Sequence, residues 1–399
     1  MATTGLMSTY RQMDVAFEKG EGVWLFDTEG NRYLDGISGI AVCGLGHCHP
    51  KITRVIQEQA SRLVHTSNLY RIPNQEKLGQ RLCEVSGMEA AFFGNSGAEA
   101  NECAIKIARL YGHNKEIDKP AIIVMDHSFH GRTLATLTAT GSRKVQAGFE
   151  PLVQGFVRAP YNDLEAVRTI ANNNPKVVAV LVEPVQGEGG IHIASDEYMK
   201  GLRAICDENG WLLMLDEIQT GNGRTGTYFA YQQLGFLPDV VTTAKGLGNG
   251  VPIGACLARG VAANTFKPGN HGSTYGGNPL CCGVALAVVD TIVSENLPAR
   301  AKALGERIVQ GFRAQLDGAE YVTEIRGKGL LIGVELKEPC AELVMLAKEQ
   351  GLLINVTSDK VVRLLPALTM SDSEADQLVT TLVKLIKVWA ADERAKPRR

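Results

Sequence analysis

Apolar runs and amphipathic stretches alternate through the middle of the chain. Five runs rich in apolar, aromatic or β-branched residues are typical of buried strands: 89–95, 121–126, 177–185, 211–219 and 239–245. The stretches between them with apolar residues at helical spacing are 98–112, 162–174 and 195–210. Continuous apolar strands between amphipathic helices predict an α/β fold, with a mainly parallel sheet covered by helices on both faces.

The two ends of the chain have a different pattern. Residues 22–36 alternate apolar and polar side chains around Glu29, Gly30 and Asn31, which predicts a β-hairpin. After a long helix at 278–297, strands and helices mix in an α+β pattern. We therefore predict three segments, of which the first packs with the third as a smaller α+β domain around the large central one. Their bounds are 1–50, 51–290 and 291–399.

Local signals place several helix ends. Ser195 and Gly210 are expected to begin and end the helix between them, and Asn162 or Asp163 is expected to cap the preceding one. The basic end of the chain, 393–399, is interpreted as a solvated terminus.

Composition narrows the class of protein. The chain has 399 residues, 45% hydrophobic and 21% charged, and a formal net charge of −2. This balance disfavours nucleic acid or an acidic membrane surface as the main partner. Nine scattered cysteines without a CxxC pair favour reduced thiols and a cytoplasmic location. No apolar run reaches about 18 residues, so we expect no membrane span.

Chemically suggestive residues follow the predicted strands. In an open α/β sheet, ligands bind beyond the carboxyl ends of the strands. The segment "GNSGAEAN" joins a strand to a helix, and the free backbone amides of Ser96, Gly97 and Ala98 could hold an anion there. A capped helix after a glycine turn explains that segment equally well. Phe129 could stack on a flat ligand and Arg132 could bind a carboxylate, although Phe129 alone would be assigned to the core.

Two further residues carry charged side chains at strand ends. Asp216 ends an apolar strand, where a carboxylate needs a partner, either a core arginine or a cationic ligand atom. Lys245 ends another strand and precedes a glycine-rich loop, a setting that suits Schiff-base formation, whereas a lysine at random is more often structural. A phosphate-bearing pyridine aldehyde requires an anion-binding site, an aromatic side chain that stacks on the ring, a carboxylate and a reactive lysine. The residues named above would supply all four at one edge of the sheet.

A series of ordered motifs carries a family resemblance. "FFGNSGAEANECAIKIAR", "HSFHGRTLATL", "LDEIQTGNGRTG", "AKGLGNGVPIGA" and "HGSTYGGNPL" resemble the class III aminotransferases, which depend on pyridoxal 5′-phosphate and have fold type I with a seven-stranded-type sheet. "LDGISGIAVCGLGHCHP", "HTSNLYRIP" and "VVRLLPAL" resemble the acetylornithine aminotransferases of arginine biosynthesis in particular. The resemblance runs from about Val15 to the last helix.

The resemblance implies a role for each matched residue at the cofactor. Lys245 would bond to the cofactor and carry the proton, and Asp216 would pair with the pyridine nitrogen. Gln219 would bind the phenolic oxygen of the ring. The remaining cofactor contacts are Phe129 and Ile218 on the ring faces, Ser96, Gly97 and Ala98 at the phosphate, and Thr274 at the phosphate of a neighbouring subunit in a homodimer with shared active sites.

Substrate roles are implied in the same way. Arg132 would bind the α-carboxylate of the acylated ornithine and the distal carboxylate of glutamate, and Arg363 the α-carboxylate of glutamate. Glu188 would pair with Arg363 when the amine substrate is bound, and Ser273 would lie near the substrate. Glu183 would support the ring pocket. The chain departs from the family pattern at Ala98, commonly threonine, and at Asn222, commonly methionine.

Alternatives remain at this point. Succinylornithine, succinyldiaminopimelate, ornithine, acetyllysine and 4-aminobutyrate transaminases would use the same core, and an aminomutase or a silent cofactor-binding protein would bind the same cofactor. "GNGRTG" (221–226) fits GxGxxG and would suit a NAD-dependent dehydrogenase, but "DEIQT" separates it from the strand, so we interpret it as a turn. His47 and His49 are too few ligands to predict a metal site.

Overall fold

The computed structural model describes residues 5–395, with side chains through residue 392. Its core is a seven-stranded sheet of order β4-β12-β11-β10-β7-β5-β6, in which only β12 runs antiparallel to its neighbours. The strands are β4 Ala90–Gly94, β5 Ala121–Met125, β6 Phe156–Ala159, β7 Val177–Val182, β10 Leu212–Asp216, β11 Val240–Thr243 and β12 Gly254–Ala258. The five predicted buried strands and the mainly parallel sheet are confirmed, and β6 and β12 are additional.

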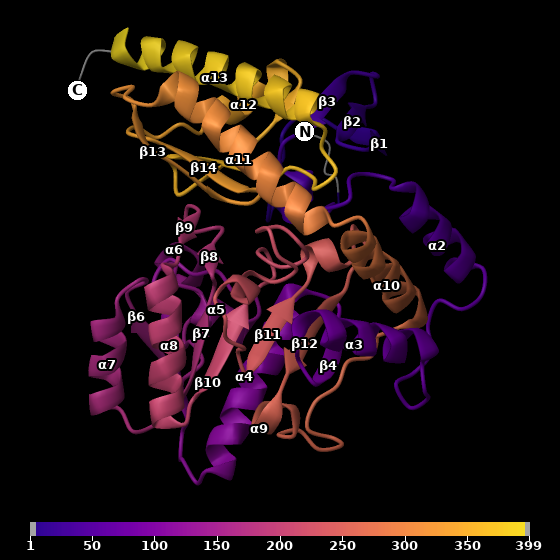
Figure 1. Ribbon diagram of the computed structural model, residues 1–399, viewed down its shortest axis with the longest axis vertical. Coiled ribbons are helices and arrows are strands. Elements are labelled where there is room, and N and C mark those ends of the chain that lie inside the picture. The colour runs from indigo at the N-terminus through magenta and orange to yellow at the C-terminus, as the bar shows by residue number, and fades with distance from the viewer. Residues whose placement is uncertain (1–4, 396–399) are drawn as a thin grey trace.

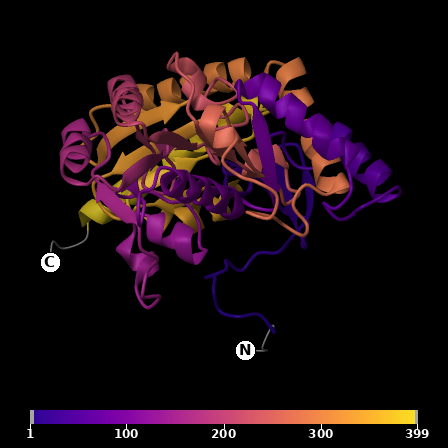
Figure 2. The same cartoon turned by 90° about the horizontal axis from the view of Figure 1, so that it is seen from below.

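Helices cover both faces of this sheet (Figures 1 and 2). Along β10, Leu212 and Met214 belong to the cluster under α4, whereas Leu213 and Leu215 belong to the larger cluster on the opposite face. Both neighbours in the strand are buried because successive side chains point to opposite faces. The helices of this layered region are α3 Pro73–Ser86, α4 Gly97–Asn114, α5 Leu134–Ala139, α6 Arg143–Gln146, α7 Leu164–Asn173, α8 Asp196–Asn209, α9 Gly260–Ala263 and α10 Pro279–Ser294.

The predicted helix caps are confirmed, and of the two candidates for the cap of α7 the structure selects Asp163. The Ser195 side chain accepts a hydrogen bond from Tyr198 N, and Gly210 ends α8 in the left-handed region at φ 63°. Asp163, rather than Asn162, caps α7 by accepting from Ala166 N. The side chain of Asn162 instead accepts from Ser195 N, so it ties the start of α7 to the start of α8.

The N-terminal hairpin packs with the C-terminal part of the chain, in the upper region of Figure 1. Strands β2 (Trp24–Asp27) and β3 (Arg32–Asp35) form the expected hairpin, and β3 pairs in parallel with β15 (Leu352–Leu353). Ahead of them, residues 5–16 leave the body of the molecule before β1 (Phe17–Glu21), as Figure 2 shows. Sequence-distant segments thus share one sheet.

A separate four-stranded sheet, of order β13-β14-β17-β16, lies beside the helices of the C-terminal part. Its strands are β13 Val322–Lys328, β14 Leu331–Leu336, β16 Asn355–Thr357 and β17 Val361–Leu364, and the helices are α11 Leu297–Leu316, α12 Leu343–Glu349 and α13 Asp372–Ala395. The predicted boundary at residue 290 lies within α10. The chain changes direction between α10 and α11 at Asn296, whose φ is +50°. The three-segment division remains a prediction.

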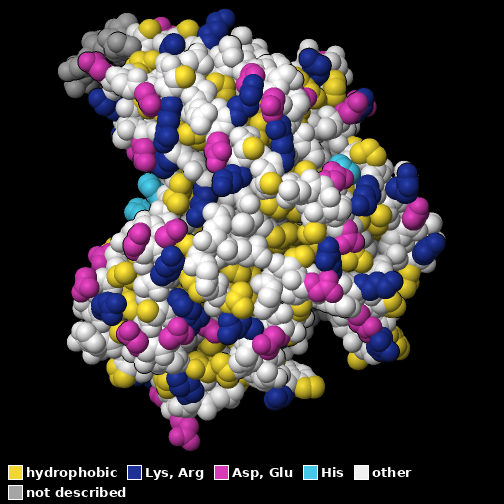
Figure 3. Space-filling view, viewed as in Figure 1, with side chains coloured by type: hydrophobic (Ala, Val, Ile, Leu, Met, Phe, Trp, Pro, Cys, Tyr) yellow, Lys and Arg dark blue, Asp and Glu magenta, His cyan; other side chains and the backbone are white. Residues whose placement is uncertain are grey.

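Short elements complete the architecture: α1 Ser38–Ala41, α2 Pro50–Ala60, β8 Val185–Gln186, β9 His192–Ile193 and the 3-10 turns Ala230–Gln233 and Lys245–Leu247. Across residues 5–395, no single helix is long and apolar enough to cross a membrane, and one bent pair, α10 with α11, meets the length and composition criteria. Charges of both signs are interspersed over the face in Figure 3, in keeping with the small net charge. The side chains of 393–399, the expected solvated terminus, lie outside the described residues.

Candidate active site

A cavity of about 430 Å³ opens at the carboxyl ends of the parallel strands. The segments after β5, β7, β10 and β11 line it, together with the N-terminus of α4. The predicted site residues in its wall are Ser96, Gly97, Ala98, Phe129, Arg132, Glu183, Glu188, Asp216, Ile218, Gln219 and Lys245. The fold therefore brings eleven of the fourteen predicted residues to one wall.

The N-terminus of α4 presents free backbone amides to the cavity. Ser96 is extended, and its Oγ accepts from Glu99 N at 3.2 Å, which caps the helix. A Cβ on Gly97 would lie 2.7 Å from Ile218 Cδ1, so the close approach of these two segments requires glycine. Helix N-termini attract anions because their N–H groups are unpaired and the helix dipole is positive there. This end of the cavity can hold a phosphate.

Lys245 follows β11 in a strained turn. Its φ is +45°, a left-handed value that is costly for a residue with a Cβ. Asn222 fixes the strand end before it by donating to Thr243 Oγ1 at 2.9 Å and to Ala244 O at 3.1 Å. Burial lowers the pKa of the Lys245 ammonium, and the nearby carboxylate of Glu188 opposes that shift. A lysine with a lowered pKa is a better nucleophile.

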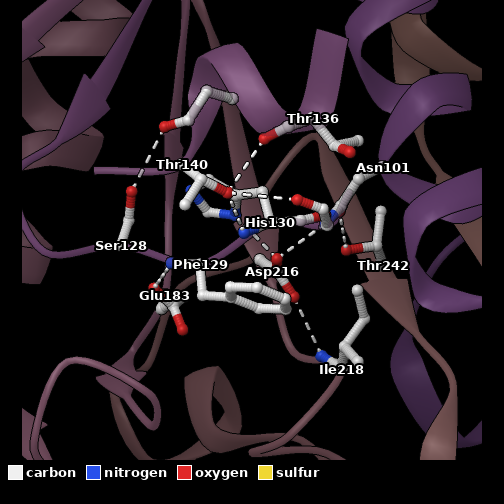
Figure 4. Close-up of polar contacts among 12 residues, drawn as sticks. Asn101, Ser128, Phe129, His130, Thr136, Thr140, Glu183, Asp216, Ile218 and Thr242 are labelled. Carbon is white, nitrogen blue, oxygen red and sulfur yellow. Dashed lines mark hydrogen bonds and ion pairs between the residues drawn. The ribbon is translucent and has the colours of Figure 1, made fainter. Parts of the chain in front are cut away.

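Asp216 is held by three donors (Figure 4). Its Oδ2 accepts from Asn101 Nδ2 and pairs with His130 Nδ1, both at 2.7 Å, and its Oδ1 accepts from Ile218 N at 3.1 Å. The residue is only 4% exposed. These donors satisfy the buried carboxylate and fix its orientation.

A flat slot lies in front of Asp216. Phe129 and Ile218 both line the cavity, and Figure 4 shows the Phe129 ring and the Ile218 side chain beside the carboxylate. Phe129 N donates to Glu183 Oε2 at 3.0 Å, which fixes the backbone that carries the ring. Burial raises the pKa of Glu183 well above its usual value, and the charge of Asp216 adds to the effect. The slot suits a planar aromatic ligand.

An ion pair closes one side of the cavity. Glu188 Oε1 contacts Arg363 Nη1 at 2.6 Å, and Arg363 Nε donates to Asn355 Oδ1 at 2.7 Å. Burial alone would raise the pKa of Glu188, but the charge and hydrogen bond of Arg363 bring it below the usual value. Arg132, by contrast, is exposed and has no ion pair among the described residues, where its guanidinium lies 5.8 Å from the Phe129 ring centroid.

Three predicted residues lie outside the cavity wall. Arg363 is fully buried behind Glu188. Ser273 and Thr274 line a neighbouring cavity of about 350 Å³, and Ser273 Oγ accepts from Asn95 Nδ2 at 3.3 Å. Thr274 is exposed on the described chain. The structure thus places Arg363 and Ser273 one contact from the cavity and does not bring Thr274 into it.

The family model for class III aminotransferases matches residues 7–386. The chain belongs to this family. It is 59% identical to the acetylornithine aminotransferase of Nitrosomonas europaea over 98% of this chain and 99% of that protein. Acetylornithine aminotransferase 1 of Bordetella pertussis is 52% identical over 98% and 100%. Among solved structures, the ornithine aminotransferase of Toxoplasma gondii superposes with a TM-score of 0.93 at 34% identity, covering 97% and 93%. The acetylornithine aminotransferase of Elizabethkingia anophelis has a TM-score of 0.87 at 34% identity, covering 96% of each chain.

Class III aminotransferases are pyridoxal phosphate enzymes, and the cavity of this aminotransferase fits that group. The amides at the start of α4 suit the phosphate, and the slot between Phe129 and Ile218 suits the ring. Gln219 Oε1 is buried without a hydrogen-bond partner, so this oxygen remains available to a ligand. Lys245 and Asp216 are the amine and the carboxylate that an aldehyde and a pyridine nitrogen require.

Sequence reasoning missed two residues of this aminotransferase site. His130 lies between the two residues that were chosen in "SFHGRT", and Asn101 ends the quoted "GNSGAEAN". Both are buried and contact Asp216. Asn101 is a polar residue on a helix face that it shares with the buried apolar Ala104 and Ile105, and such a position is a signal for a buried polar contact.

The glycine-rich segment and the histidine that were not predicted to bind a dinucleotide or a metal make structural contacts. Gly221–Gly226 forms turns, as expected, and places Arg224 in the core, where it donates to Leu330 O and Pro366 O. His47 Nε2 lies 2.8 Å from Asp35 Oδ2, and this contact raises the pKa of His47 to about 10. Over the described part of the chain, no group of three or more His, Cys, Asp or Glu side chains is arranged to hold a metal ion.

Proposed function

We propose that this enzyme moves the terminal amino group of N2-acetyl-L-ornithine to 2-oxoglutarate, giving N-acetyl-L-glutamate 5-semialdehyde and L-glutamate. The step belongs to arginine biosynthesis. The observation that carries the proposal is the contrast between the two arginines, since Arg132 is free at the cavity and Arg363 is masked by Glu188. The names of the relatives most similar to this chain support the substrate class.

The chain's own residues divide the chemistry. Pyridoxal phosphate, when bound, supplies an electron sink that weakens bonds at the carbon bearing the amine. Lys245, whose pKa is lowered by burial, would take a proton from that carbon and deliver it to the C4′ carbon of the cofactor. Asp216 would hold a proton on the pyridine nitrogen, where it would stabilise the developing charge. The two oxygens of Asp216 are already oriented by Asn101, His130 and Ile218 N.

The arginines distinguish the two substrates. The acylated ornithine has one carboxylate, which Arg132 binds, and its distal end carries an amine that a free arginine would repel. Glu188 neutralises Arg363 for that substrate. Glutamate and 2-oxoglutarate carry a second carboxylate, which takes the place of Glu188 on Arg363 by a bidentate contact. One cavity then serves both half-reactions in a ping-pong order.

We also propose a homodimer with shared active sites. Thr274 is exposed and lines the neighbouring cavity, which suits a contact with a neighbouring subunit's phosphate. Exposed apolar side chains offer a surface for a second copy of the chain, among them Met7, Tyr10, Leu69, Tyr70 and Tyr275. Nine free cysteines suit a reducing cytoplasm, where we place the enzyme.

The experiment that tests the substrate is a comparison of amines at fixed 2-oxoglutarate, with glutamate formation as the readout. N-acetylornithine should give the highest kcat/KM in a panel with N-succinylornithine, N-succinyldiaminopimelate, ornithine, acetyllysine and 4-aminobutyrate. A higher value for another member would reassign the substrate. Cofactor-loaded enzyme without glutamate formation from any amine would favour an aminomutase or a silent cofactor-binding protein.

A further inference from the structure

One oxygen of Asp216 is fully occupied by the protein. Oδ2 receives the Asn101 amide and the His130 imidazole, each at 2.7 Å, whereas Oδ1 receives a single backbone amide at 3.1 Å. Figure 4 shows Asn101 and His130 on one side of the carboxylate and Ile218 on the other. Oδ1 therefore keeps a lone pair for a ligand in the cavity.

The Asn101 amide has only one orientation available. Its Nδ2 donates to both Asp216 Oδ2 and His130 O, at 2.7 and 2.8 Å, and its Oδ1 accepts from Thr242 Oγ1 at 2.7 Å. A flipped amide would place the amide oxygen of Asn101 against two acceptors, Asp216 Oδ2 and His130 O. Because Asn101 is 0% exposed, water cannot relieve such a mismatch.

His130 is fixed in the same way. Its backbone N donates to Thr140 Oγ1 at 2.9 Å, and the ring is buried. Its Nε2 is buried with no hydrogen-bond partner among the described residues. A proton on Nε2 would have no acceptor, so the contacts favour the tautomer with the proton on Nδ1, which donates to Asp216.

We propose that His130 and Asn101 are positioning residues that fix the orientation of the Asp216 carboxylate and aim its free oxygen at the pyridine nitrogen. They act through Asp216 and do not touch the substrate. This inference rests on pyridoxal phosphate binding and is independent of which amine the enzyme accepts, so an error in the substrate assignment leaves its test unaffected.

The test uses full-length enzyme reconstituted with pyridoxal phosphate labelled with ¹⁵N in the ring. His130→Leu removes the donor, and His130→Asn keeps an amide nitrogen near the position of Nδ1. Three quantities are measured: the ¹⁵N chemical shift of the ring nitrogen, the dissociation constant of the cofactor, and the thermal unfolding of the cofactor-free protein.

We expect His130→Leu to bind the cofactor about tenfold more weakly, since a hydrogen bond to a charged group is lost. Its ring nitrogen resonance should move toward the unprotonated value, and His130→Asn should restore it. A wild-type resonance in His130→Leu overturns the proposal even if affinity falls, because a merely structural role would weaken binding without deprotonating the ring. If His130→Leu does not fold, Asn101→Leu replaces it with the same expectation.

Discussion

Glu188→Gln is the substitution that most sharply separates the two half-reactions. The glutamine amide would keep the size and one oxygen of the native side chain but lose the charge that masks Arg363. In the wild type the pair is 2.6 Å apart, with the arginine side chain 1% exposed and the glutamate side chain 33% exposed. The guanidinium would remain buried and would be available to a carboxylate without first releasing a competitor.

The size of the effect follows from that contact. A hydrogen bond between charged groups contributes about 1.5–3 kcal/mol, and the partial exposure of Glu188 places this pair near the lower end. About 1.4 kcal/mol is a factor of ten in an equilibrium constant. We therefore expect 2-oxoglutarate and glutamate to bind about tenfold more tightly in Glu188→Gln, and the acetylornithine half-reaction to become about tenfold less efficient.

The assay is rapid mixing of enzyme in each cofactor form with one substrate at a time, followed by the absorbance of the bound cofactor. Asp239→Asn is the matched control, because Asp239 pairs with Arg203 at 2.8 Å and lies before β11, at the end of the sheet away from the cavity. The control should leave both half-reactions unchanged. Changes of the same sign in both half-reactions of Glu188→Gln, or no change in either, would refute the proposal that Glu188 masks Arg363 for one substrate and releases it for the other.

Three further results are expected. Lys245→Ala should lose transamination and the visible band of the enzyme-bound cofactor; retained turnover would remove Lys245 from its role. Ser96→Ala and Ser195→Ala should each lower the free energy of unfolding by about 1 kcal/mol, because both residues cap helices, but only Ser96→Ala should weaken cofactor binding; equal binding by both variants would argue against a phosphate at α4. Burial raises the pKa of Glu217 from 4.5 to about 7. The folded state then binds the extra proton, so the free energy of unfolding should fall as pH rises from about 4.5 to about 7. Glu217→Gln should lack this loss in denaturant titrations across that range, and an identical pH profile would contradict the reasoning.

The strands and their order along the chain follow from local pattern. Buried parallel strands are continuous apolar runs, and Ser195 and Gly210 each carry a helix-end signal in a single residue. Asp216 and Lys245 could be chosen because charged side chains that end apolar strands have few structural explanations. The assignment of their roles came from the ordered motifs of the family.

The pattern of apolar and polar residues does not predict which distant side chains and strands contact each other. Asn101 and His130 lie 115 and 86 residues from Asp216 in the sequence, and nothing local relates them. The pairing of β3 with β15 likewise joins distant segments. Arg363 could be named from "VVRLLPAL", but only the structure shows that its guanidinium is buried behind Glu188. Side-chain partners depend on tertiary packing, which periodicity does not encode.

The most direct test of the central claim is a spectrum of the pyridoxal-phosphate-loaded enzyme mixed with N-acetylornithine and no keto acid. The account predicts that the visible band of the bound cofactor disappears and returns when 2-oxoglutarate is added, because one cavity serves both substrates in turn. A band that N-acetylornithine leaves unchanged, in enzyme whose cofactor is bound, would contradict the account.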